Sequence, residues 1–332
     1  MTKKTKNTIL FLSLSVVCIV VFALDLLYGS VNISIKELLS PNDIHREILW
    51  NFRLPKAITA LSVGAAISVA GLIMQTLFKN PLADPYILGI SSGASLGVAI
   101  MLLGGTLFPA ISFSSGWCMV LAAVIGAMIV LGLVLSISFK VKQAVSLLII
   151  GIMFGQIAGS VVTILQNYSN PDALKLFVTW SFGSLQAVGW SYMVVMLPII
   201  LIGLALVFFM QKQLNGFLLG EHYAKGLGIS IVKTRVMIII AVALLAGATT
   251  AFTGPIAFIG FAMPHLARGL FKSANHKIVI PATMLCGAAT LLLCDIASTQ
   301  IPQEGHSLPI NAITSLIGAP FVVWVIFKRM RW

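Results

Sequence analysis

Long apolar runs, separated by short polar or charged segments, follow one another along almost the whole chain. About 20 apolar residues in a helix reach across the hydrocarbon core of a bilayer, and the runs lack the period-two alternation of a barrel strand. The pattern therefore predicts an all-α integral membrane protein with ten transmembrane helices. The predicted spans are residues 9–28, 57–78, 87–107, 117–139, 144–166, 190–210, 235–253, 256–271, 278–299 and 308–327.

The boundary between the seventh and eighth spans depends on Gly254 and Pro255, because few polar residues interrupt residues 236–263. Proline lacks the backbone donor that a helix needs, and glycine permits a turn. A break here also places an even number of crossings between the basic residues around Arg235 and those around Arg268. We therefore expect two short spans instead of one long helix.

The basic residues predict the orientation. With the N-terminus inside, sixteen of the 21 Lys and Arg residues fall on the cytoplasmic side and five fall outside. Cytoplasmic loops collect Lys and Arg, so the pattern predicts that both termini are cytoplasmic. The inner set is Lys3, Lys4, Lys6, Lys79, Lys140, Lys142, Lys212, Lys225, Lys233, Arg235, Arg268, Lys272, Lys277, Lys328, Arg329 and Arg331, and the outer set is Lys36, Arg46, Arg53, Lys56 and Lys175.

Composition excludes several classes of protein. With 59% hydrophobic and 9% charged residues, the chain has too little polar surface for a water-soluble globule. The net charge of +12 comes from clusters between apolar spans, not from one basic face, so it indicates topology signals and no nucleic-acid partner. The cysteines lie inside or beside apolar spans without CxxC spacing and predict neither a zinc site nor a disulfide framework.

The source of energy for transport is not visible in this chain. No G-x-x-x-x-G-K-[ST] loop for binding ATP occurs. Acidic residues are scarce inside the spans, since Asp25 and Asp295 lie near span ends and Asp84 lies at a break. Ion-coupled transporters usually carry ionisable groups near the midplane. We therefore expect another subunit to supply the energy. The alternative from a different class is a secondary transporter driven by an ion gradient.

An intramembrane protease is excluded because no Ser/His, HExxH or paired aspartate constellation occurs.

Three motifs share a family resemblance. Residues 53–93 contain R-L-P-K, then N-P-L-A-D-P at 80–85, then a glycine- and serine-rich helix start; residues 220–228 read G-E-x-x-A-x-x-L-G; residues 254–268 read G-P-I-A-F-I-G-F-A-M-P-H-L-A-R. These motifs resemble those of permease subunits of type II ABC importers (FecCD-type), which import iron-siderophores, haem and vitamin B12. The resemblance runs from about Arg53 to Lys328 and implies an inverted repeat of helices two to five and seven to ten.

The motif at 220–228 resembles the coupling segment with which these permeases dock on their ATPase. It lies in a cytoplasmic segment, about 214–230, and reads as a short helix closed by a left-handed Gly228. The resemblance implies that the coupling residues are Gly220, Glu221, Ala224, Leu227 and Gly228. The alternative is a solvated amphipathic loop helix.

Arg53 and Lys56 stand at the outer mouth of the second span. They are interfacial anchors or, as the resemblance implies, partners for acidic residues on the two lobes of a substrate-binding protein. Two basic points on a mostly neutral outer face would steer such a partner. The family often has an arginine where this chain has Thr299, so one basic contact is missing.

Asn80 and Leu82 lie at the span break, where unwound backbone is tolerated only if it is buried or lines a cavity. The resemblance implies a cytoplasmic gate there. Gln156 and Ser160 belong to small and polar residues of the fifth span that either line the pathway or permit close helix packing. His265 has no second His or Cys at ligand spacing, so no metal site is expected.

The sequence thus predicts a single permease domain over residues 1–332, in the cell inner membrane, without a cofactor of its own. The resemblance implies a homodimer with the pathway at its two-fold interface, two ATPase subunits that bind ATP and Mg²⁺, and one substrate-binding protein. The expected cargo is a metal chelate, first an iron-siderophore, with haem or cobalamin as alternatives.

Overall fold

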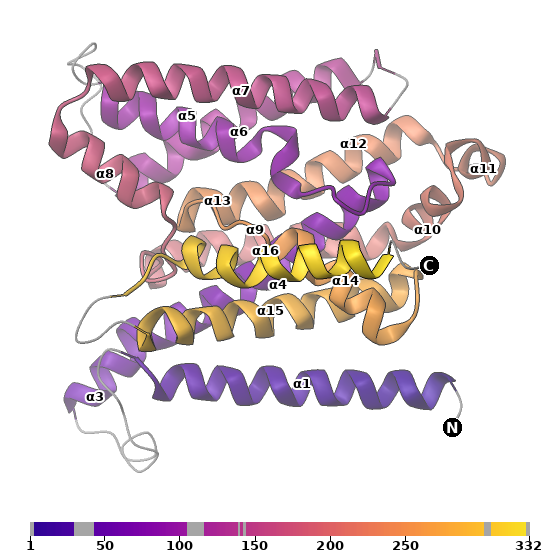
Figure 1. Cartoon of the computed structure of the whole chain (residues 1–332), viewed down its shortest axis with the longest axis horizontal. Helices are drawn as coiled ribbons and strands as arrows, with labels where there is room; N and C mark the ends of the chain where they lie inside the picture. The colour runs from indigo at the N-terminus through magenta and orange to yellow at the C-terminus, as the bar shows by residue number, and fades with distance from the viewer. Residues whose placement is uncertain are drawn as a thin grey trace. The chain divides into compact units, whose positions relative to one another are not determined.

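The computed structural model describes residues 3–29, 43–104, 116–138, 140–141, 144–301 and 307–329, and every regular element in these ranges is helical (Figure 1). Seven helical stretches in the described residues are long and apolar enough to cross a membrane. The prediction of an all-helical membrane protein is confirmed. The ten-crossing topology, its inverted repeat and its cytoplasmic termini stay predictions.

Each predicted span falls on a helix. The long helices are α1 (Lys3–Leu27), α4 (Leu54–Phe78), α6 (Gly116–Ser138), α7 (Ala144–Tyr168), α9 (Trp190–Phe209), α15 (His276–Gln300) and α16 (Ile310–Arg329). The seventh span is α12 (Ile231–Val242), a π-helical turn (Ala243–Gly247) and α13 (Ala248–Thr253). The shorter helices are α3 (Asp43–Ile48), α5 (Ile90–Leu103), α8 (Pro171–Ser181), α10 (Gln211–Leu219), α11 (Glu221–Gly226) and α14 (Ile259–Phe271).

Two predicted spans are shorter than expected. The third begins as a short turn, Pro85–Leu88, and continues as α5. The eighth is α14, whose 13 residues reach only about 20 Å at 1.5 Å per residue. The predicted break before α14 is confirmed, because α13 ends at Thr253 and Gly254 has a φ of 73°.

The contacts group the chain into two compact units. The first unit comprises residues 1–72, 184–198 and 256–332. Within it α1 lies beside α15 (Figure 1), and α4 packs against α15 through two glycines. A Cβ at Gly64 would collide with the carbonyl oxygen of Gly287, so this close approach of two helices requires small residues.

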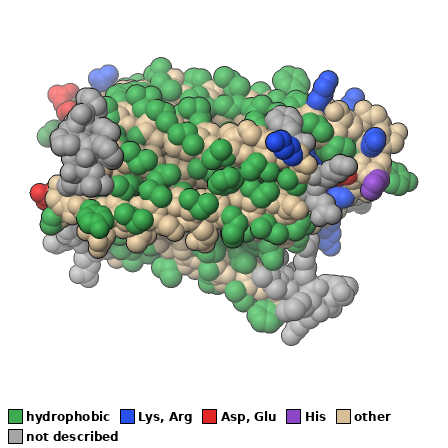
Figure 2. All heavy atoms as spheres, turned by 90° about the horizontal axis from the view of Figure 1, so that it is seen from above, with side chains coloured by type: hydrophobic (Ala, Val, Ile, Leu, Met, Phe, Trp, Pro, Cys, Tyr) green, Lys and Arg blue, Asp and Glu red, His purple; other side chains and the backbone are tan. Residues whose placement is uncertain are grey.

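The second unit comprises residues 73–183 and 199–255. Its helices α5, α6 and α7 pack side by side (Figure 1), with Gly97 against the backbone of Ala122. Large apolar side chains on α6 and α7 remain exposed, among them Leu121, Met128 and Ile157. Figure 2 shows hydrophobic side chains over much of one face, as expected of surfaces that meet lipid. The single-domain assignment stays a prediction.

Candidate functional site

In the segment after α9, the backbone turns at two glycines, each with a positive φ. Gly220 joins α10 to α11 with φ 115° and ψ 152°, a conformation open only to glycine. Gly228 follows α11 with φ 76°. The amide of Ile229 donates to the carbonyl of Ala224 at 3.0 Å, and that of Gly228 donates to the carbonyl of Lys225 at 3.0 Å. This is a Schellman motif, so the prediction of a short helix closed by a left-handed Gly228 is confirmed.

Ala224 holds α11 against α10. It is completely buried, as are Leu214 and Phe217 of α10. A Cβ at Gly216 would collide with the side chain of Ile229 and lie 3.8 Å from that of Ala224. The alanine of the motif therefore has a packing function, and the two short helices form one folded piece.

The opposite side of this piece exposes apolar side chains. Leu219, Tyr223 and Leu227 have exposed fractions of 63%, 68% and 61%. Of these, sequence reasoning identified only Leu227. The four-residue spacing from Leu227 back to Tyr223 within the short helix could have found Tyr223, but Leu219 lies on α10, beyond the break at Gly220, and no spacing signals it. Three exposed apolar side chains on a fixed backbone suit a protein partner, since exposed apolar patches mark interaction sites and tyrosine is enriched among the residues that carry most binding energy at interfaces.

Glu221 is paired within the chain. Its Oε1 lies 2.7 Å from Nη2 of Arg235 on α12, and the arginine is buried. Sequence reasoning treated Glu221 as a charge for a partner and assigned Arg235 only to the topology signals. The structure brings the two together because α11 folds back beside the start of α12.

The predicted gate segment is a sequence of tight turns. Lys79 has a φ of 48°, Oδ1 of Asn80 accepts from the amide of Leu82 at 2.9 Å, and Oδ1 of Asp84 accepts from the amide of Tyr86 at 2.9 Å. Desolvation by burial raises the pKa of Asp84 to about 6, with the Tyr86 hydrogen bond acting the other way. Leu82 is 47% exposed. A Cβ at Gly220 would lie 3.2 Å from Nζ of Lys79, so this segment and the α10–α11 turn are neighbours.

Gln156 and Ser160 lie on an exposed face of α7. The hydroxyl of Ser160 donates to the carbonyl of Gln156 at 2.9 Å, and a Cβ at Gly159 would meet nothing within 4 Å. Close packing against another described helix therefore does not explain the small residue at this point of α7.

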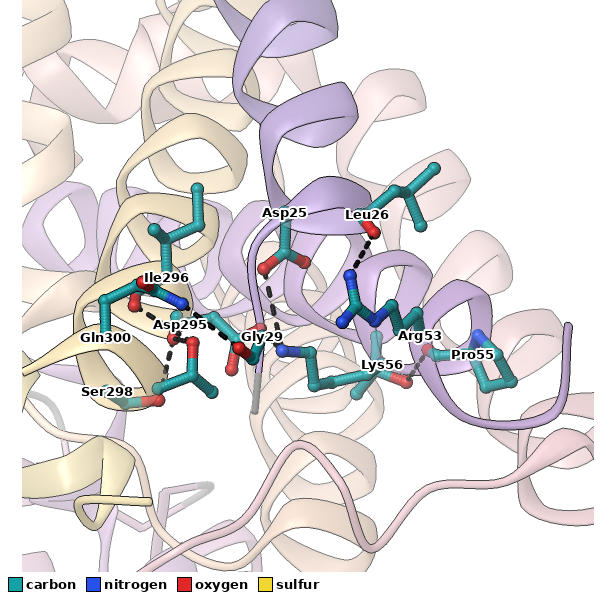
Figure 3. A network of polar contacts seen from close by, with 12 residues as sticks. Asp25, Leu26, Gly29, Arg53, Pro55, Lys56, Asp295, Ile296, Ser298 and Gln300 are labelled. Carbon is teal, nitrogen blue, oxygen red and sulfur yellow. Dashed lines mark hydrogen bonds and ion pairs between the residues drawn. The ribbon is translucent and has the colours of Figure 1, made fainter. Parts of the chain in front are cut away.

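Arg53 and Lys56 form a buried cluster with the end of α1 (Figure 3). Nη1 of Arg53 donates to the carbonyls of Leu26 at 2.5 Å and Leu27 at 2.7 Å. Nζ of Lys56 lies 2.7 Å from Oδ2 of Asp295 and 3.6 Å from Oδ1 of Asp25. Helix α1 thus ends with carbonyls satisfied by a guanidinium, and the buried ammonium is paired as buried charges must be.

This cluster corrects the expectation of two basic points on an exposed surface. Arg53 and Lys56 are each only 6% exposed. Both residues are buried because α1 and α15 supply oxygen partners for them. The sequence alone did not pair Arg53 and Lys56 with these oxygens. Both basic residues border a cavity of about 290 Å³, which Thr299 and the exposed Asn51 and Gln186 also line.

His265 lies beside Phe261, with ring centroids 5.3 Å apart and ring planes tilted by 51°. Among the residues that the structure describes, no three His, Cys, Asp or Glu side chains gather as metal ligands would.

The helical arrangement and the motifs point to one family, and the profile of the FecCD transport family matches residues 17–328. The chain belongs to the FecCD transport family. It is 37% identical to the uncharacterised ABC transporter permease protein YvrB of Bacillus subtilis, over 88% of this chain and 82% of that protein. It is 32% identical to the vitamin B12 import system permease protein BtuC of Salmonella typhi, over 99% and 98% of the two chains. Its fold matches a solved metal-chelate type ABC transporter in an inward-facing conformation, with a TM-score of 0.87, 28% identity and coverage of 96% and 99%.

As a FecCD permease, the chain is a multi-pass transport subunit of the inner membrane and not an enzyme. FecCD permeases belong to ABC importers, so an ATPase and a substrate-binding protein are implied as partners. This membership sets aside the ion-gradient alternative.

Proposed function

We propose that this FecCD permease imports a metal chelate, driven by two ATPase subunits that dock on α10, α11 and the turn at Gly228. The exposed Leu219, Tyr223 and Leu227 carry this proposal, because they stand on a backbone fixed by the Schellman motif and by Ala224. In this arrangement Gly220, Ala224 and Gly228 shape the surface, and Leu227 contacts the partner.

Capture of the ATPase by the tagged permease tests this docking surface. Leu227→Glu combined with Tyr223→Asp should weaken capture about tenfold or more, since charge replaces apolar contact at the centre of an interface. Leu176→Glu is the matched control, because Leu176 is also largely exposed but lies on α8, on the predicted outer side. Equal capture by the double variant and wild type would disprove the docking role.

We propose further that two copies of the chain form the pathway at their two-fold axis, with Gln156 and Ser160 lining it and with Asn80 and Leu82 at its cytoplasmic gate. The exposure of this face of α7 supports the first assignment, and the exposure of Leu82 supports the second. A residue near a two-fold axis faces its own copy. Ser160→Cys, in a chain without the four native cysteines, should therefore form a disulfide-linked dimer, whereas exposed Leu176→Cys should not. Monomers only at both positions would refute this interface.

We propose that the binding protein docks on the outer side, at the cavity that Arg53 and Lys56 border. Burial of both residues moves the expected contact from a flat charged surface to the rim of this cavity, where Asn51 and Gln186 are exposed.

For the cargo, an iron-siderophore remains the first proposal, and cobalamin is the second because several relatives are named vitamin B12 permeases. Uptake of ⁵⁵Fe-loaded siderophores and of ⁵⁷Co-cyanocobalamin into proteoliposomes of the assembled importer separates the two. Uptake of cyanocobalamin without any ferric chelate would overturn the first choice.

A further inference from the structure

One buried arginine joins three pieces of the second unit. Arg235 lies near the start of α12, and 5% of it is exposed. Its Nη2 lies 2.7 Å from Oε1 of Glu221, the first residue of α11. Its Nη1 donates to the carbonyl oxygen of Val141, just after α6, at 3.0 Å. The guanidinium therefore ties α11 to α12 and to the chain that leaves α6.

Only arginine suits this position. Its planar group presents donors in two directions at fixed angles, so it bonds two acceptors on different segments at once. A lysine ammonium carries the same charge but lacks the planar pair of donor groups that points at two acceptors. The bond to Glu221 also keeps the buried guanidinium paired, which a buried charge requires.

This pairing changes the role of the glutamate in the motif. Only 31% of the Glu221 side chain is exposed, and its carboxylate already has a cationic partner in the same chain. The apolar Leu219, Tyr223 and Leu227 are left as the surface for a partner. Glu221 thus belongs to the support of the segment and not to its contact surface.

We infer that Arg235 is a positioning residue that holds α11 in a fixed orientation on α12. Displacement of α11 by a docked ATPase is then passed through the guanidinium to α12 and to Val141 beyond α6, and not lost in a loose loop. This inference rests on the proposed docking of an ATPase at α10 and α11. The tie between α11 and α12 does not depend on that docking.

Hydrogen–deuterium exchange on the full-length permease in detergent tests the tie without any partner. The amides of Gly228 and Ile229 report on α11, because their hydrogen bonds close its end. Arg235→Met should speed their exchange about tenfold, because the protection reports the free energy of local opening. Arg235→Lys should give an intermediate effect, and the swap Glu221→Arg with Arg235→Glu should recover only part of the lost protection, because a carboxylate at position 235 can pair with position 221 but cannot donate to the carbonyl of Val141. Lys233→Met is the matched control, since Lys233 is an exposed cation on the same helix.

Unchanged amide exchange in Arg235→Met would overturn the inference. A charge swap that recovers no protection, together with wild-type exchange in Glu221→Gln, would also overturn it. The second result would mean that the glutamate does not hold the segment.

The assembled importer tests the transmission. In proteoliposomes, Arg235→Lys should still capture the ATPase, but stimulation of ATP hydrolysis by the binding protein should fall about fivefold or more, and the charge swap should not recover it, because it lacks the hydrogen bond to Val141. Stimulation equal to wild type in Arg235→Lys and Arg235→Met would overturn transmission through this residue. Failure of the wild-type chain to capture any ATPase would instead disprove the proposed function and leave the exchange result standing.

Discussion

The ammonium nitrogen of Lys56 lies 2.7 Å from Oδ2 of Asp295, and both side chains are buried. The pair connects the start of α4 to the last third of α15, and Asp25 brings the end of α1 to the same point (Figure 3). A sequence motif associated with docking thus also fastens three helices of the first unit together.

Replacing Lys56 by methionine leaves two buried carboxylates without their cation. Breaking a buried pair from one side costs about 3–5 kcal/mol. We therefore expect a large fall in the thermal unfolding midpoint of the detergent-solubilised protein. Lys175→Met removes an exposed cation and should change stability by less than about 0.5 kcal/mol. Equal midpoints for Lys56→Met and wild type would show that the cluster contributes nothing.

Docking of the binding protein is better tested at the cavity rim than at the cluster. Arg53→Glu with Lys56→Glu would place two further acids beside Asp25 and Asp295, so we expect it to unfold the region and not only to reduce affinity. Gln186→Glu is exposed and leaves the cluster intact. It should weaken affinity for the binding protein about threefold to tenfold at low salt and less at high salt, because rim charges act through screened electrostatics. An affinity independent of this substitution at low salt would place docking elsewhere.

Gly228 and Gly226 form a matched pair. A Cβ at either position meets nothing within 4 Å, but only Gly228 has a positive φ. Alanine at Gly228 should therefore destabilise the segment by about 1–2 kcal/mol, whereas alanine at Gly226 should be neutral or stabilising. Exchange of the Ile229 amide measures the difference. Faster exchange in Gly226→Ala than in Gly228→Ala would contradict the conformational explanation.

The predicted topology puts Lys175 outside and Ala274 inside, with three crossings between them. Both positions are exposed, whereas Thr253 at the predicted outer turn is buried and would label poorly. In a chain without Cys18, Cys118, Cys286 and Cys294, a cysteine at 175 should react with an impermeant thiol reagent added to intact spheroplasts, and one at 274 should react only after lysis. Labelling of both in intact spheroplasts would refute the ten-crossing arrangement.

Asp84 predicts a dependence of stability on pH. Burial raises its pKa from 3.8 to about 6, so the folded state disfavours the charged carboxylate. The contribution of Asp84 to stability is therefore lost as the pH rises from about 4 to about 6, and the loss is complete above that range. Asp84→Asn retains an oxygen that can accept from the Tyr86 amide. It should match wild type near pH 4 and unfold at a higher temperature at pH 7. A difference in unfolding midpoint that does not vary with pH would argue against the burial effect.

The helices and the Gly228 cap were predictable because they depend on local sequence. Twenty apolar residues specify a helix in a bilayer, and a glycine after a short helix specifies a left-handed cap. The environments of Arg53, Lys56 and Glu221 were not predictable, since each depends on a partner that only the fold brings near. Asp25, Asp295 and Arg235 were visible as charges at span ends, but hydropathy does not say which of them meet. A buried charge at a span end is a signal that a partner exists, not which one it is.

The cluster around Lys56 also has a consequence for biogenesis. Chain synthesis delivers Asp25 to the membrane first, then Arg53 and Lys56 with the next helix, and Asp295 only with the last but one. Until α4 emerges, the last carbonyls of α1 and the carboxylate of Asp25 have no basic partner from this cluster, and until α15 is inserted the ammonium has only its weaker, 3.6 Å contact. The first helix is therefore tied to the second early, by Arg53 and Lys56, whereas the ion pair that fastens α4 to α15 forms only near the end of translation, and a chain truncated before Asp295 would lack it.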